Sequence, residues 1–191
     1  MKKYLLFILI SLALLGSCKK ENPKVEIITY KGTIVLELDL ENAAVTANNF
    51  LKLVEDGVYD GGSFYRSGRG QRTEENPVPV RILQGGIRHK PQKTDLAPLE
   101  IEKAGETGLK HDYLTVSLVN EGDKAATEFF ICMNPQPELD RGGALNPDGG
   151  KYLPFGKVIS GEEVVHKVWG SPAMGELIDP LIIIHKIKKR K

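Results

Sequence analysis

The chain has 191 residues, enough for one domain with a sizeable core, and 41% of them are hydrophobic, as in an ordinary globular protein. Basic and acidic residues nearly balance, 26 against 25, which argues against nucleic acid as a partner. The 4 histidines lack the paired spacing of metal ligands, and no glycine-rich segment has the strand–loop–helix context of a phosphate-binding loop. We therefore expect neither a metal site nor a cofactor.

Residues 1–17 are predicted to be a signal peptide that is removed from the mature protein. Two lysines near the start precede an apolar run at 4–15, which is too short to span a bilayer comfortably. The sequence Leu-Gly-Ser-Cys at 15–18 resembles the lipobox of bacterial lipoproteins. This resemblance implies cleavage before Cys18 and lipidation of that residue. The alternative is an ordinary secretory signal that contains a cysteine by chance.

The lipoprotein interpretation predicts a location for the protein. Residues 18–24 are then the lipidated Cys18 and a polar tether, and several acyl chains on one residue anchor a protein firmly. We expect the protein to be lipid-anchored to a membrane of the bacterial cell envelope, on the periplasmic side of the outer membrane. Cys132 would be the one remaining thiol, and its apolar neighbours predict that it is buried.

Residues 25–191 are predicted to form the folded domain, which begins with a hairpin. The strands 25–30 and 33–40 flank a turn at Lys31-Gly32. In the second strand apolar residues alternate with Val35, Glu37 and Asp39, so one face should be buried and the other exposed.

A helix is expected next, because four apolar residues follow the i, i+3, i+4, i+7 spacing of a single buried stripe. These residues are Ala47, Phe50, Leu51 and Val54. Thr46 or Asn42 is expected to cap the start of this helix, and Gly57 to end it.

The remaining apolar segments are short and separated by turns. The predicted strands are 63–66, 81–84, 114–119, 128–133, 155–159 and 181–187, and a second helix is predicted at 162–168. Many short strands with two helices indicate an antiparallel barrel with helices over its open ends. No nucleophile elbow and no Cys–His pair is present, so these patterns alone indicate an exported β-rich domain and nothing more specific.

Five motifs, in a fixed order, suggest a family. They are TANNF at 46–50, YDGGSFYR at 59–66, LQGG at 83–86, TEFFI at 127–131 and PFGKV at 154–158. Together they resemble the cyclophilin family, and the similarity spans nearly all of 25–188. The resemblance implies a closed eight-stranded antiparallel β-barrel capped by two α-helices. It also implies peptidyl-prolyl cis-trans isomerase activity in a groove on the outer surface.

The resemblance also implies the catalytic residues. Arg66 matches the essential arginine, Gln84 the glutamine that orients it, and Phe130 the floor of the proline pocket. Each has a plainer interpretation: a salt-bridged arginine at a strand end, a polar residue before a Gly-Gly bend, and an ordinary core phenylalanine.

Other positions match substrate-binding residues of the family, some with a different side chain. The backbone of Asn120 is expected to pair with an extended peptide, and Ile82 and Leu139 are expected to line the pocket. Further substrate-binding positions differ from the family pattern: Tyr65 and Tyr152 stand where the family has histidine, and Glu128 where it has glutamine. Arg81 replaces an aromatic residue and is expected to make one pocket wall charged.

Two functional hypotheses follow from these residues. In the first, the protein isomerises X-Pro bonds in exported polypeptides and assists their folding. In the second, it is a module that binds proline-containing segments, or a chaperone, with little or no turnover. A purely structural lipoprotein is a third, weaker alternative. In each of the first two, the partners are proline-containing polypeptides and, through the lipid anchor, a membrane; we expect a monomer.

Overall fold

The computed structural model describes residues 21–71, 74, 77–90, 96, 104–122 and 126–190. The predicted signal peptide, the predicted lipidation site Cys18 and the first residues of the predicted tether lie outside this part of the chain. Among the described residues, no helix is both long enough and apolar enough to cross a membrane.

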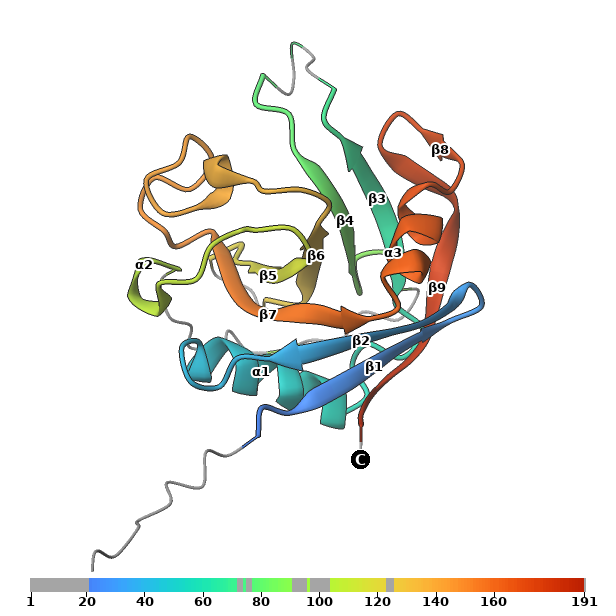
Figure 1. Ribbon diagram of the computed structural model, residues 1–191. Coiled ribbons are helices and arrows are strands. Elements are labelled where there is room, and N and C mark those ends of the chain that lie inside the picture. Colours follow the sequence, from blue (N-terminus) through green and yellow to red (C-terminus); the bar gives the residue numbers. More distant parts are fainter. Residues whose placement is uncertain are drawn as a thin grey trace, which may run out of the picture.

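Within the described residues, eight antiparallel strands close into a barrel (Figure 1). Their order is β1-β2-β7-β5-β6-β4-β3-β9, and β9 pairs back with β1. A ninth, two-residue strand, β8, extends the sheet beyond β9. This confirms the predicted closed barrel, whereas β8 was not predicted. The bounds are β1 Lys24–Thr29, β2 Gly32–Leu38, β3 Ser63–Arg69, β4 Arg81–Gly86, β5 Thr115–Val119, β6 Glu128–Cys132, β7 Tyr152–Ser160, β8 Ala173–Met174 and β9 Leu177–Lys189.

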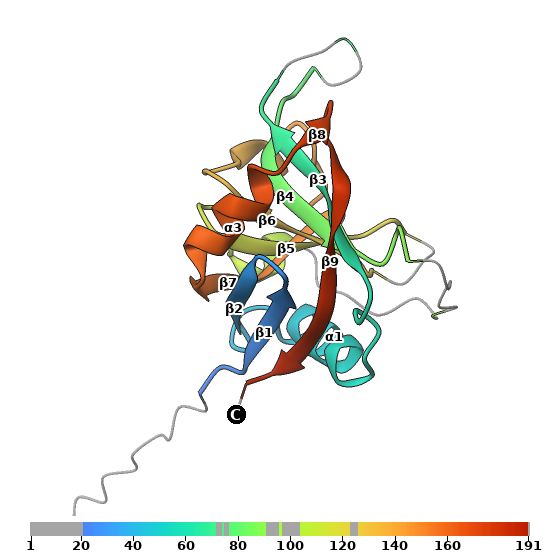
Figure 2. The ribbon, with the colours of Figure 1, turned by 90° about the vertical axis from the view of Figure 1, so that its right-hand side faces the viewer.

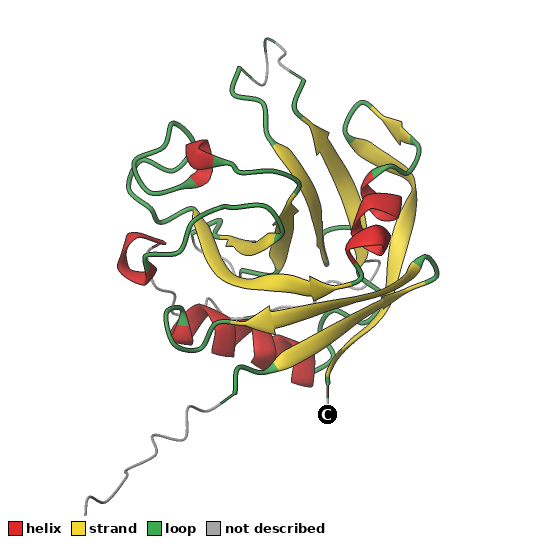
Figure 3. Ribbon diagram, in the orientation of Figure 1, coloured by secondary structure: helices red, strands yellow, loops and turns green. Residues whose placement is uncertain are grey.

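Two helices pack on the barrel and contact different strands (Figure 3). Helix α1, Ala44–Glu55, follows the end of β2, whereas α3, Glu162–Trp169, packs against its start. A side chain at Gly32 would place its Cβ 2.6 Å from Val164 of α3, so glycine allows this close approach. The turn consists of Tyr30 and Lys31, one residue earlier than predicted, and Gly32 begins strand β2. A short helix α2, Ala104–Thr107, and a 3-10 turn, Pro137–Leu139, were not predicted.

The start of α1 differs from the prediction. Ala43 occupies the cap position without a capping side chain, and Thr46 is buried inside the helix. The carboxylate of Asp39 instead accepts hydrogen bonds from the backbone N–H of Glu41 and of Asn42, so it organises the preceding turn. The expected caps Thr46 and Asn42 are therefore wrong, because an acidic side chain further upstream orders this turn.

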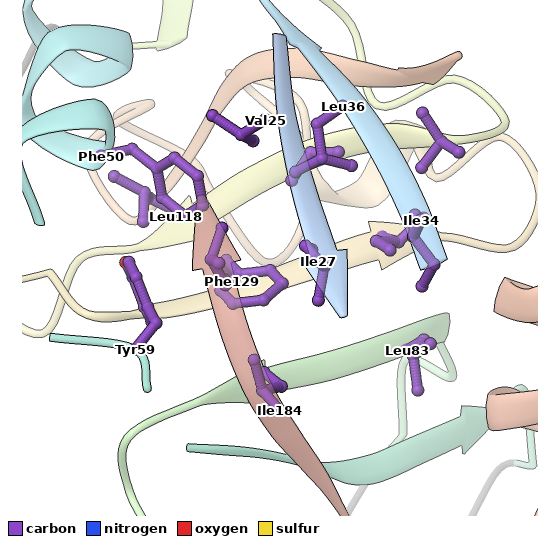
Figure 4. Close-up of a cluster of buried hydrophobic side chains, with 14 of the residues drawn as sticks. Val25, Ile27, Ile34, Leu36, Phe50, Tyr59, Leu83, Leu118, Phe129 and Ile184 are labelled. Atoms are coloured by element: carbon purple, nitrogen blue, oxygen red, sulfur yellow. The ribbon is translucent and has the colours of Figure 1, made fainter. Parts of the chain in front are cut away.

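The interior of the barrel is packed with aliphatic and aromatic side chains (Figure 4). Phe50 of α1 enters this core, where its ring lies 5.1 Å from Tyr59, 5.7 Å from Phe129 and 4.8 Å from Phe155. Cys132 is fully buried and unpaired, as predicted, and burial raises the pKa of its thiol.

A bulge in β3 reverses the direction of one side chain. The register with β4 and with β9 shifts between Phe64 and Arg66. In a regular strand these residues would face the same side, because side chains alternate with a period of two. Here Phe64 lies in the barrel core, while Arg66 lines a pocket outside it.

Candidate active site

Arg66, Gln84 and Phe130 lie opposite one another on three neighbouring strands. Arg66 of β3 is in register with Gln84 of β4, and Gln84 is in register with Phe130 of β6. Cross-strand neighbours of this kind carry their side chains on the same face of a sheet. Phe129 belongs to the barrel core and Phe130 to a separate apolar cluster, so this face is the outer one. The structure therefore brings together the three predicted catalytic residues in one row.

This row borders a pocket of about 140 Å³. Three predicted substrate-binding residues, Ile82, Leu139 and Tyr152, also line it. Its remaining walls are Val80, Val119 and Leu145, which sequence reasoning did not identify. The pocket is thus mainly apolar and carries a guanidinium and an amide at one side. A small apolar ring beside a hydrogen-bonding group would match it.

Phe130 is fixed in place by aromatic and polar neighbours. Its ring stacks on His111 at 5.8 Å and meets Tyr152 edge-on at 5.7 Å. His111 is itself anchored, with Nδ1 2.9 Å from Asp140 and Nε2 3.0 Å from the hydroxyl of Ser117. The floor of the pocket therefore rests on a side chain that cannot turn freely.

The surroundings of His111 and Asp140 determine their protonation states. Burial lowers the pKa of His111 below its ordinary value, although Asp140 acts in the opposite direction. Burial tends to raise the pKa of Asp140, but hydrogen bonds from the backbone and ring of His111 outweigh it, and the pKa is lowered. A neutral His111 that donates from Nδ1 to an ionised Asp140 and accepts from Ser117 at Nε2 satisfies all three groups.

The guanidinium of Arg66 is held from two sides. Its Nη1 donates to Oε1 of Gln84 at 3.2 Å, and its Nε donates to Oε2 of Glu176 at 2.8 Å. The salt bridge that was the plainer interpretation of Arg66 therefore exists, but the same side chain also lines the pocket. Glu176 was missed because no motif marks it and 110 residues separate it from Arg66.

Tyr65, Asn120 and Glu128 were expected to bind substrate but do not line the pocket. Asn120 follows Val119 at the end of β5, and its backbone N–H donates to the carbonyl of Lys151 at 2.8 Å. Only its carbonyl, to which none of the described residues donates, could pair with a peptide.

The expectation that Arg81 makes a pocket wall charged is wrong. Its guanidinium lies over the ring of Trp169, 5.3 Å from the ring centroid, and the pocket is lined instead by the next residue, Ile82. The guanidinium gains a favourable cation–π contact with this ring instead of facing the pocket. The sequence did not predict the contact because Trp169 lies on a helix far from Arg81 along the chain.

Tyr65 and Glu128, two departures from the family pattern, are buried near each other. Oε1 of Glu128 accepts a hydrogen bond from the backbone N–H of Ile87 at 3.0 Å. The other carboxylate oxygen and the hydroxyl of Tyr65 are buried, and none of the described residues bonds to either with good geometry. Burial raises the pKa of Glu128, while nearby donors, Tyr65 first, partly oppose this shift. A buried carboxylate with one unsatisfied oxygen is costly to ionise.

We therefore predict that Glu128→Gln stabilises the protein at neutral pH. Because the pKa of Glu128 is raised on folding, the folded state binds this proton more tightly, and stability falls as the pH rises from the ordinary value near 4.5 through the folded value. The glutamine cannot ionise, and its amide could donate to Tyr65. Urea unfolding at pH 8 should show a gain of about 1–2 kcal/mol that shrinks below pH 4. Glu163→Gln on α3, which is exposed, serves as the control. An equal gain at both pH values would contradict this explanation.

The chain is thus a closed antiparallel β-barrel whose outer face carries an apolar pocket beside an arginine. The chain belongs to the cyclophilin-type peptidyl-prolyl cis-trans isomerase family, whose sequence pattern matches residues 24–189. The chain is therefore a peptidyl-prolyl cis-trans isomerase of the cyclophilin type.

Curated relatives and solved structures agree with this assignment. The chain is 34% identical over 150 residues to the peptidyl-prolyl cis-trans isomerase cyp18 of Streptomyces antibioticus, covering 76% of this chain and 82% of that protein. It is 32% identical over 142 residues to peptidyl-prolyl cis-trans isomerase A of Dickeya dadantii, covering 73% and 67%. A cyclophilin-type isomerase of Cryptosporidium parvum, solved in the presence of the dipeptide Ala-Pro, shares the fold with a TM-score of 0.65. That alignment covers 88% of this chain and 99% of that chain at 24% identity.

Proposed function

We propose that this isomerase acts on X-Pro bonds of exported polypeptides, with Arg66 as the catalytic donor and Phe130 as the floor of the proline pocket. The observation that carries the proposal is that the guanidinium of Arg66 and the ring of Phe130 line one pocket. In this interpretation the pyrrolidine ring of proline enters the apolar part of the pocket.

The chemistry requires only a fixed donor. Amide resonance resists twisting, so an uncatalysed X-Pro bond isomerises over tens to hundreds of seconds. As the bond twists, resonance is lost and the prolyl nitrogen regains a lone pair. A donor aimed at this nitrogen binds the twisted state better than either planar state and so lowers the barrier. Arginine suits this role because it stays charged and its donors lie in one plane.

The neighbouring residues have supporting roles in this mechanism. Gln84 orients Arg66 through the bond to Nη1. Ile82, Leu139 and Tyr152 complete the walls around the proline ring. The carbonyl of Asn120 pairs with the peptide backbone, whereas Tyr65 and Glu128 are buried and do not line the pocket.

The proposed location rests on the N-terminal sequence. Cleavage before Cys18 and lipidation of its thiol would anchor the domain through the tether 18–24. In a Gram-negative host we expect the intact protein to incorporate radiolabelled palmitate and to sediment with the outer membrane. Cys18→Ser should abolish both, while Cys132→Ser should change neither. A labelled or membrane-bound Cys18→Ser protein would contradict lipid anchoring at this residue.

A binding module without useful turnover is the second candidate. It is favoured by the ion pair that already engages the guanidinium of Arg66. The mature chain, added to a short proline-containing peptide, should accelerate cis–trans exchange measured by two-dimensional NMR. Shifts of the peptide signals without faster exchange would support the module and contradict catalysis.

A further inference from the structure

We infer that Glu176 is a positioning residue for catalysis, which fixes the guanidinium of Arg66 in the plane needed for donation to the prolyl nitrogen. The inference rests on the proposed role of Arg66. Its basis is the 2.8 Å contact between Nε of Arg66 and Oε2 of Glu176, made while Nη1 of Arg66 contacts Gln84.

The fold places Glu176 accurately at this point. Gly175 and Glu176 form the turn between β8 and β9, and Gly175 adopts a φ of 61°, which favours glycine. The carbonyl of Glu176 accepts a hydrogen bond from the backbone N–H of Ser67 at 2.8 Å, and Leu177 is in register with Arg66. Figure 2 shows the turn between β8 and β9 beside the end of β3. The carboxylate therefore belongs to a segment docked on the strand that carries Arg66.

The two contacts have complementary effects on the guanidinium. Gln84 contacts the guanidinium from β4, and Glu176 contacts it from the other side, where β9 begins. Rotation of the guanidinium is therefore restrained from both directions. The remaining nitrogen, Nη2, makes no hydrogen bond to any described residue and is left for the substrate. Both side chains of the ion pair are about one-third exposed, at 33% and 32%, so the pair contributes little to stability. We therefore assign the ion pair the role of orienting a catalytic donor. Small displacements of such groups slow reactions strongly.

The test compares Glu176→Ala and Glu176→Gln in the mature protein, using isomerase kinetics. Glu176→Ala should lower kcat/KM about tenfold, mostly through kcat, because a misplaced Arg66 donates less well to the prolyl nitrogen of the twisted state. Glu176→Gln, whose amide oxygen can still accept from Nε, should recover much of this loss. Glu55→Ala is the matched control, since it removes an exposed glutamate whose ion pair with Lys189 lies elsewhere on the barrel.

Two further measurements separate this inference from the proposed function. The Nε–H signal of Arg66 in the NMR spectrum should exchange with water faster in Glu176→Ala than in the wild type. In an Arg66→Ala background, Glu176→Ala should have no additional effect on the rate. Wild-type kinetics in Glu176→Ala, or higher activity, would overturn the positioning role and leave Arg66 catalysis intact. Wild-type activity in Arg66→Ala would instead overturn the proposed function itself.

Discussion

Arg66→Ala should lower kcat/KM for a proline-containing peptide by about 100- to 1000-fold in a protease-coupled assay. The expected loss is that of a fixed donor to the prolyl nitrogen, whose lone pair becomes available only as the bond twists. The barrel should remain folded, because the side chain is one-third exposed and its ion pair is a partly solvated one. The NMR or circular dichroism spectrum should therefore match that of the wild type.

Two variants test the specificity of this effect. Arg66→Lys keeps the positive charge but lacks the planar fork, so it cannot contact Gln84 and Glu176 together and should resemble Arg66→Ala. Arg190→Ala removes an arginine that pairs with Glu26, and should leave the rate unchanged. Arg66→Ala with wild-type kinetics would leave the pocket without a chemical role.

Alanine at the adjacent positions Phe129 and Phe130 should have different effects on activity, because only Phe130 lines the pocket. Phe129 lies among core rings, 5.7 Å from Tyr59 and 5.8 Å from Phe64, so Phe129→Ala should lower the free energy of unfolding by about 3–5 kcal/mol. Phe130 is also fully buried, although in the smaller outer cluster, so Phe130→Ala should destabilise the fold by a similar amount, about 3–5 kcal/mol. In addition, Phe130→Ala should lower kcat/KM about 30-fold or more, since it removes the surface that receives the proline ring.

Urea unfolding and isomerase kinetics, measured on the same samples, test this contrast. Activity of Phe129→Ala is to be measured at low temperature, where the folded state dominates, and should then approach that of the wild type. The leucine variants at the two positions provide milder controls. A folded Phe130→Ala protein with full activity would show that the pocket does not receive proline.

The candidate site could be placed from the sequence because its motifs lie within single strands. Arg66, Gln84 and Phe130 sit in segments whose resemblance to one family marked them, and the structure brings all three to one pocket. Their supports could not be placed in this way. Glu176 and Trp169 belong to distant segments, and their contacts with Arg66 and Arg81 depend on how the C-terminal part of the chain docks on β3 and β4.

Local patterns in the sequence determined that the chain forms a barrel of short strands with two helices, and which side of α1 is buried, because hydrophobic spacing reports burial directly. Only the tertiary structure decided which face of β3 carries Arg66, since a bulge between Phe64 and Arg66 breaks the alternation that the sequence would suggest. It also decided that Arg81 turns to Trp169 and that Glu176 meets Arg66. The physical reason is the same in each case: register and docking are set by contacts between residues far apart in the chain, and no local pattern encodes them.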